Sequence, residues 1–107
     1  MKVINNIKEI DSIINNNDIV IAMFGSSNCG PCRVIKEKLD NYLALNNDVE
    51  GIYIPTEKHT QYCASHSIFM VPTLIVYVKG KETIKKIRNV SFMELEEQIN
   101  HFKELIK

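Results

Sequence analysis

The sequence has no excess of charge of either sign, no long hydrophobic run and only three cysteines in 107 residues. Lys plus Arg and Asp plus Glu both number 13, so no overall basic field is available to hold nucleic acid or an anionic membrane. The longest early apolar run, IVIAMF at 19–24, is far shorter than a membrane span. We therefore expect neither nucleic acid nor membrane among the partners.

A secretion signal is also missing, because Asn5 and Asn6 interrupt the first apolar residues at once. We therefore expect a cytoplasmic protein. In that compartment three cysteines do not predict a structural disulfide framework, and a close pair of cysteines indicates redox or metal chemistry. The length and the 45% of hydrophobic residues predict a single domain over residues 1–107 with one core.

Hydrophobic periodicity predicts an α/β fold with a central mixed β-sheet and helices on both faces. Apolar runs predict strands at 3–4, 19–24, 51–54, 73–78 and 83–88. Helical spacing predicts helices at 7–14, 30–45, 56–65 and from 91 onward. Thr56 is expected to cap the third helix, and Ser91 with Glu94 forms a capping box for the last. Strand–helix alternation implies parallel strands, and the hairpin that turns at KGKE (79–82) adds an antiparallel edge.

The segment FGSSNCGPCR at 24–33 carries two cysteines directly after a buried strand. Pro31 suits the first position of a helix, because its missing N–H would be unbonded there, and Gly30 allows a sharp turn off the strand. Cys29 is thus expected at a helix N-terminus, where free N–H groups favour the thiolate and lower its pKa from about 8.5. Cys32 lies one turn on, within disulfide reach.

This arrangement predicts thiol–disulfide exchange. Cys29 would attack a substrate disulfide, and Cys32 would attack the resulting mixed disulfide and release the reduced product. Arg33 would add positive potential. The alternatives are two buried packing thiols or half of a zinc site, although a zinc site usually needs four ligands and the sequence has no second CxxC.

Three motifs give the chain a family resemblance: CGPC at 29–32 after a buried strand, VPT at 71–73 before another, and the KGKE turn. Together with the element order, they resemble the thioredoxin family over essentially the whole chain. The resemblance implies a thioredoxin fold and a cis bond before Pro72. Such a bond would hold the Val71 backbone beside Cys29, where an extended substrate could pair with it. Without the resemblance, Pro72 is equally consistent with a rigid strand start.

The chain departs from the family pattern around the site. Asn28 stands where the family usually has a Trp before the first cysteine, and Met23 stands where it has a buried Asp. Tyr53 falls near the lysine that commonly pairs with that Asp, and Arg88 or Asn89 falls near a flanking glycine. The redox pair is intact, whereas the acid–base support and the recognition surface are altered.

Residues before Pro72 are candidates for substrate contact. Phe69 and Met70 are consistent with either core residues or an apolar rim beside the proline, and we assign Met70, Val71 and Asn28 to substrate binding. Gly30, Pro31 and Pro72 are assigned to support of the active site.

A second constellation lies in the third predicted helix, where His59, Cys63 and His66 follow at i, i+4 and i+7. This spacing could hold a metal, but no fourth ligand is evident. We expect Cys63 to be a small buried side chain and predict no metal site.

The sequence thus predicts a thioredoxin-type protein disulfide reductase that works through a reversible Cys29–Cys32 dithiol/disulfide couple, without a bound cofactor. The implied partners are disulfide-containing proteins and a thioredoxin-reductase-like electron donor, and we expect a monomer. One alternative is a dedicated electron-transfer partner of a specific reductase or peroxidase. Another is a thioredoxin-fold binding module with little redox activity.

Overall fold

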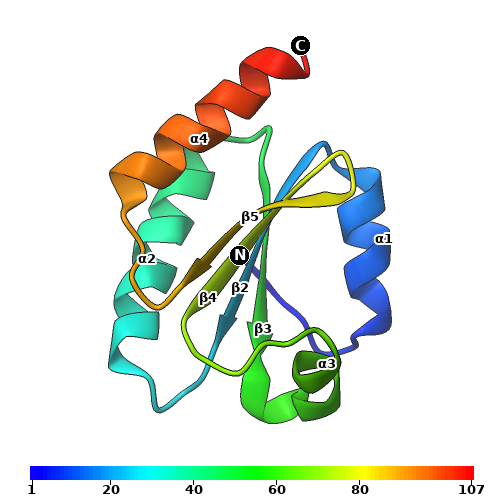
Figure 1. Ribbon diagram of the computed structural model, residues 1–107, viewed down its shortest axis with the longest axis vertical. Coiled ribbons are helices and arrows are strands. Elements are labelled where there is room, and N and C mark those ends of the chain that lie inside the picture. The colour runs from blue at the N-terminus through cyan, green and yellow to red at the C-terminus, as the bar shows by residue number, and fades with distance from the viewer.

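Five strands form one mixed sheet, and helices cover both of its faces (Figure 1). The computed structural model describes all residues, 1–107. The strands are β1 (Lys2–Val3), β2 (Ile19–Gly25), β3 (Glu50–Pro55), β4 (Thr73–Val78) and β5 (Lys81–Ile87). The helices are α1 (Lys8–Asn16), α2 (Gly30–Leu45), α3 (Thr60–Ser65) and α4 (Phe92–Leu105), with a 3₁₀ turn η1 (Thr56–Lys58) before α3.

The strand order is β1-β3-β2-β4-β5, with β3 parallel to β1 and β2, and β4 antiparallel to β2 and β5. The predicted α/β fold with a mixed sheet is therefore confirmed. Thr73 pairs with Phe24 on one side and with Ile87 on the other. The end of β2, the start of β4 and the end of β5 consequently meet at one edge of the sheet. This edge carries both the CGPC corner and the VPT segment.

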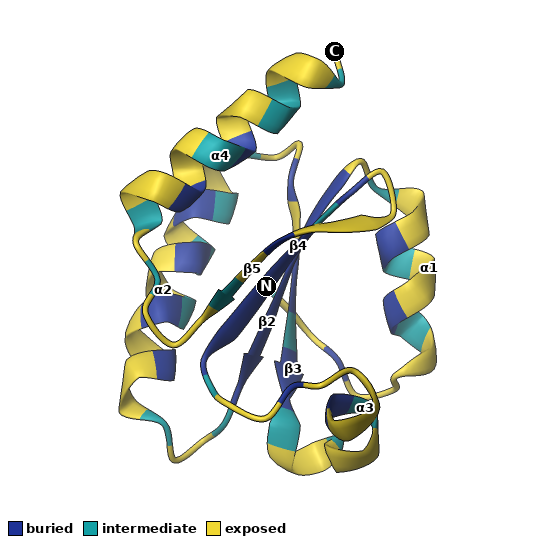
Figure 2. Cartoon of the chain, in the orientation of Figure 1, coloured by how far each residue is buried: buried dark blue, intermediate teal, exposed yellow.

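The central strand β2 is buried along its whole length, as its continuous apolar run predicts (Figure 2). Alternate residues of β2 point to opposite faces of the sheet. Ile21 and Met23 join the cluster beneath α2 and α4, whereas Ala22 and Phe24 join the cluster beneath α1 and α3. The sheet is therefore covered by α2 and α4 on one side and by α1 and α3 on the other (Figure 1).

The prediction of one continuous helix over 56–65 is wrong, because two separate elements occupy this segment. Residues 56–58 form η1, and α3 begins only at Thr60. Thr56 does not cap a helix: its hydroxyl donates to the carbonyl of Gly25 at 3.2 Å. At the break, a ring nitrogen of His59 lies 2.9 Å from the carbonyl oxygen of Ile4, the residue after β1. This contact and the bond from Thr56 to Gly25 of β2 override the helical spacing.

The hairpin and the last helix differ from expectation in detail. The turn is a two-residue loop, Lys79–Gly80, with φ of 52° and 82°, as tight hairpins require. At the start of α4, the Ser91 hydroxyl accepts from the N–H of Glu94, which confirms half of the capping box. The Glu94 carboxylate instead accepts from Lys86 at 2.8 Å, so the reciprocal bond is not made.

Two leucines of α2 test the packing of this helix on the sheet. Leu39 is fully buried, whereas Leu45 is 86% exposed on the same helix. We expect Leu39→Ala to lower the free energy of unfolding by about 2–5 kcal/mol, because it removes buried methyl groups and leaves a cavity. Leu45→Ala is the matched control and should change it by less than about 0.5 kcal/mol. Urea unfolding of both variants measures the difference, and equal losses would contradict the observed docking of α2.

Candidate active site

The two cysteines of the CGPC segment lie at the corner where β2 gives way to α2. Cys29 is the N-cap residue of α2, with extended backbone, and its sulfur accepts a hydrogen bond from the Cys32 N–H at 3.2 Å. The two residues are joined by a disulfide, with their Cα atoms 5.2 Å apart. The sequence-based placement of Cys29 at a helix N-terminus is confirmed.

Gly30 and Pro31 have slightly different positions from those expected. Gly30 is the first residue of α2 and Pro31 the second, so the proline is not at the first helical position. Gly30 has no left-handed backbone, and a Cβ there would meet no atom within 4 Å. The sharp turn therefore does not depend on Gly30.

The two sulfurs differ in access to solvent. Cys29 is half-buried, whereas Cys32 is 2% exposed and belongs to the core cluster beneath α2. An incoming disulfide can therefore reach the Cys29 sulfur from solvent, whereas the core shields the Cys32 sulfur. This asymmetry suits Cys29 to attack and Cys32 to resolve.

The loop between β2 and α2 is fixed by Glu57 of η1. One carboxylate oxygen of Glu57 accepts hydrogen bonds from both the N–H and the hydroxyl of Ser27, each at 2.9 Å. These bonds lower the pKa of Glu57 below its usual value. Asn28 is exposed in the same loop, directly before Cys29. The ionised carboxylate thus holds the segment that presents the attacking cysteine.

A cavity of about 140 Å³ opens beside the disulfide and is lined by residues of the loop, α2 and β3: Ser26, Ser27, Cys29, Cys32, Arg33, Lys36 and Tyr53. The Tyr53 hydroxyl packs over Gly25, where a Cβ would lie only 2.9 Å from that oxygen. Burial, followed by the charge of Glu57, raises the pKa of Tyr53. Lys36 lies 5.7 Å above the Tyr53 ring and places a cation at the cavity.

The VPT segment lies at the same edge of the sheet. The Val71–Pro72 bond is cis, as the family resemblance implies. The Thr73 hydroxyl donates to the Met70 carbonyl at 2.6 Å, and the Arg88 N–H donates to the Pro72 carbonyl at 2.7 Å. Pro72 is buried, whereas Met70 is 52% exposed.

The residues before Pro72 are surface residues. Phe69 is 78% exposed, and both Phe69 and Met70 line a cavity of about 150 Å³ together with Ile87 of β5. The expectation that these two side chains form an apolar rim fits this placement, and the alternative of core residues does not.

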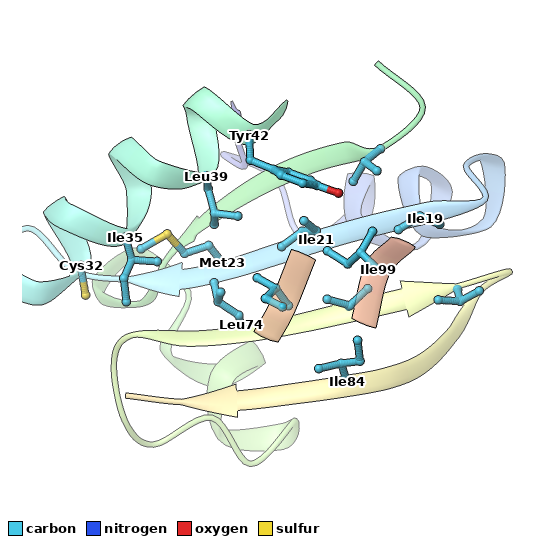
Figure 3. Close-up of a cluster of buried hydrophobic side chains, with 14 residues drawn as sticks. Ile19, Ile21, Met23, Cys32, Ile35, Leu39, Tyr42, Leu74, Ile84 and Ile99 are labelled. Carbon is cyan, nitrogen blue, oxygen red and sulfur yellow. The ribbon is translucent and has the colours of Figure 1, made fainter. Parts of the chain in front are cut away.

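Met23 lies beneath the corner, fully buried in the same cluster as Cys32 (Figure 3). The figure shows Met23, Ile35 and Cys32 at one end of this cluster, between α2 and the sheet. Thr73 is the one polar residue among the buried residues, so no carboxylate or histidine is buried beside Cys32. The buried environment of Cys32 therefore holds no side chain that accepts a proton readily near neutral pH.

The constellation of His59, Cys63 and His66 does not converge on a metal. No group of three His, Cys, Asp or Glu side chains is placed to hold an ion. The His59 ring bonds to the Ile4 carbonyl, and the His66 ring stacks on Tyr62 with centroids 4.0 Å apart. Cys63 is buried and unpaired, as expected, and burial raises the pKa of its thiol.

A site of this geometry exchanges disulfides, and the comparisons with known proteins agree with it: the protein is a thiol–disulfide oxidoreductase. A family model described as thioredoxin matches residues 2–101. The chain therefore belongs to the thioredoxin family.

Individual relatives are similar at modest identity. The chain is 26% identical over 90 residues to thioredoxin from Mycoplasma genitalium, covering 84% of this chain and 85% of that one. It is 26% identical over 97 residues to thioredoxin from Mycoplasmoides gallisepticum, covering 91% and 97%. Among solved structures, thioredoxin from Fasciola hepatica superposes with a TM-score of 0.83 at 25% identity, covering 95% and 99%. Mitochondrial thioredoxin 3 from Saccharomyces cerevisiae, in its oxidised form, superposes at 0.82 with 22% identity, covering 94% of each chain. The predicted thioredoxin fold is confirmed.

Two features of the site were missed in the sequence. The contact of Ser27 with Glu57 joins residues 30 positions apart, and no spacing pattern announces it. The bond from the Arg88 N–H to the Pro72 carbonyl was also missed. No pattern in the sequence indicates this bond, which joins residues 16 positions apart.

The buried Met23 generates a prediction about the resolving step. We expect Met23→Asp to lower the free energy of unfolding by roughly 3 kcal/mol or more, because it buries an unpaired carboxyl group. We also expect it to speed the attack of Cys32 near pH 7, because a carboxylate can accept the Cys32 proton. The measurement mixes reduced protein with one equivalent of a chromogenic aromatic disulfide and follows the second thiolate released, from pH 6 to 9.

Met23→Asn is the matched control for this prediction. Asparagine is similar in shape and polarity but does not accept a proton in this range, so it should destabilise the protein without speeding resolution. Superimposable pH–rate curves for the wild type and Met23→Asp would show that Met23 does not limit the step.

Proposed function

We propose that the protein reduces disulfide bonds in other proteins, with Cys29 as the nucleophile and Cys32 as the resolving thiol. The observation that carries this assignment is the half-buried Cys29 sulfur at the start of α2, in front of the buried Cys32. The thiolate of Cys29 attacks one sulfur of the substrate disulfide, and the other sulfur leaves as a thiolate. Cys32, after losing its proton, then attacks Cys29 and closes the Cys29–Cys32 disulfide. Two electrons pass from the dithiol to the substrate, which takes up two protons.

Substrate positioning is assigned to the segment that ends in the cis-proline. Neither the N–H nor the carbonyl of Val71 makes a hydrogen bond within the protein. An extended substrate can therefore pair with both groups as an added strand. Asn28 and Met70 are both exposed, and we assign them to contacts with the substrate residues around its attacked disulfide. Pro72, buried at the start of β4, holds the segment in place, while Gly30 and Pro31 shape the first turn of α2.

The oxidised site must be reduced again for turnover. Thioredoxins work with disulfide substrates and a reductase, so a thioredoxin-reductase-like protein is the proposed electron donor, with no bound cofactor in this chain. Residues 1–107 are taken as one domain that acts as a monomer in the cytoplasm, which fits the single sheet and the two-cysteine motif. No helix of the structure has the length and apolar character needed to cross a membrane.

Cysteine variants test the assigned roles. We expect Cys29→Ser to abolish insulin reduction by dithiothreitol-driven turnover, because the attacking sulfur is lost. Cys32→Ser should accumulate mixed disulfides between Cys29 and substrate, since the resolving thiol is missing. Mass spectrometry of the non-reduced protein detects these adducts.

Cys63→Ala serves as the control, because Cys63 lies in α3 on the opposite face of the sheet. It should leave the rate within about twofold of wild type, which corresponds to less than about 0.5 kcal/mol in the barrier. If the Cys29→Ser variant kept wild-type turnover and formed adducts on Cys32, the roles of the two cysteines as nucleophile and resolving thiol would be reversed.

A further inference from the structure

The chain contains two arginines: Arg33 lines the cavity beside the active-site disulfide, and the Arg88 backbone bonds to the cis-proline segment. We propose that Arg33 and Arg88 each present a cation to the substrate, and that they select protein disulfides with an acidic side chain near the attacked cysteine. This inference rests on the proposed function and specifies its substrate class.

Arg33 is placed by the first turn of α2. It directly follows Cys32, is exposed, and lines the same cavity as both cysteines. Glu37 stands one helical turn farther on, yet no ion pair joins it to Arg33. The guanidinium of Arg33 is therefore a free cation next to the reacting sulfurs.

Arg88 is held by an unusual backbone conformation. Its φ is 67°, and the Asn89 N–H bonds to the Ile87 carbonyl at 2.8 Å, which closes a three-residue turn around Arg88. Turns of this kind with positive φ are rare and strained for a residue with a side chain. The Arg88 N–H is bonded to the Pro72 carbonyl, so this turn is fixed beside the segment that positions substrate.

The other two non-glycine residues with positive φ have ordinary structural roles. Ser67 follows the end of α3, where left-handed residues commonly terminate helices, and Lys79 forms the two-residue hairpin loop. At Arg88 a glycine would adopt the turn without strain. Strained backbone that persists beside an active site points to a functional side chain, here a cation at the substrate-binding edge.

The charge around the site favours an anionic partner. Neither arginine forms an ion pair or a side-chain hydrogen bond within the protein. Among the acids, Glu94 is paired with Lys86 and Asp40 with the N-terminal amine, whereas Glu37 and Glu57 make no ion pair. The guanidinium group donates paired hydrogen bonds that match the two oxygens of a carboxylate. Both guanidinium groups are therefore available to an incoming carboxylate.

The test compares three peptides that each hold one intramolecular disulfide, flanked by Glu, Gln or Lys. Reduced protein is mixed with each peptide, quenched with acid, and the reduced fraction gives a second-order rate constant. Each constant is divided by that for dithiothreitol, whose attacking thiolate carries the same charge as that of Cys29, to remove intrinsic differences between the disulfides. We expect the Glu peptide to exceed the Lys peptide by about tenfold at low salt, because complementary charge raises the encounter rate. The ratio should fall towards one in 0.5 M salt, where the screening length is only about 4–5 Å.

The variants locate the effect. Because Cys29 attacks every peptide, any change in thiol reactivity cancels in the Glu-to-Lys ratio. Arg33→Gln and Arg88→Asn should each lower the ratio, and the double variant should bring it close to one. Arg88→Lys should retain most of the preference. Lys81→Gln is the matched control, since it removes the same charge from the opposite end of β5 and should leave the ratio unchanged.

The outcomes separate the two claims. A wild type that reduces the Glu and Lys peptides equally at low salt overturns the substrate class but leaves the disulfide reductase intact. If Lys81→Gln lowers the Glu-to-Lys ratio as much as Arg88→Asn does, the substrate class is likewise overturned and the disulfide reductase remains. A wild type that reduces none of the peptides overturns the proposed function, and the inference falls with it.

Discussion

The hydrogen bond from the Cys32 N–H to the Cys29 sulfur is the contact on which the rest of the site depends. It exists because Cys29 caps α2 at the end of the short loop that follows β2, so that an unbonded helical N–H points at the first cysteine. The same N–H group stabilises negative charge on that sulfur after reduction. The sheet, the docking of α2 through Leu39, and the contact of Glu57 with Ser27 all keep this corner in place.

The surroundings of this corner set how the chemistry proceeds. A buried methionine beneath Cys32 packs well and avoids an unpaired buried charge, but it offers no proton acceptor to the resolving thiol. The Tyr53 hydroxyl lines the adjacent cavity, yet its raised pKa keeps it protonated near neutral pH. At the opposite side of the corner, Arg88 adopts a strained turn that glycine would relieve. The chain thus combines the Cys29–Cys32 pair with a buried methionine beneath it and an arginine in a neighbouring strained turn.

Features encoded locally could be predicted from the sequence, and features made by distant contacts could not. The apolar run of β2, the Ser91 cap and the CGPC corner each depend on neighbouring residues, and the structure has them where the sequence places them. The division of the third helix at His59 depends on the Ile4 carbonyl, 55 positions away, so helical spacing could not reveal it. The cis bond before Pro72 followed only from family resemblance, because most X–Pro bonds are trans.

The pH dependence of cysteine alkylation tests most directly whether the start of α2 makes Cys29 the reactive thiolate. The fully reduced Cys63→Ala protein would be treated briefly with iodoacetamide between pH 5 and 10, and labelling of Cys29 and Cys32 would be quantified separately by peptide mapping. We expect Cys29 to react half-maximally at a pH below about 8.5, the pKa of a free cysteine, and Cys32 only at higher pH. Equal profiles for the two thiols, or earlier labelling of Cys32, would contradict the role assigned to the helix N-terminus.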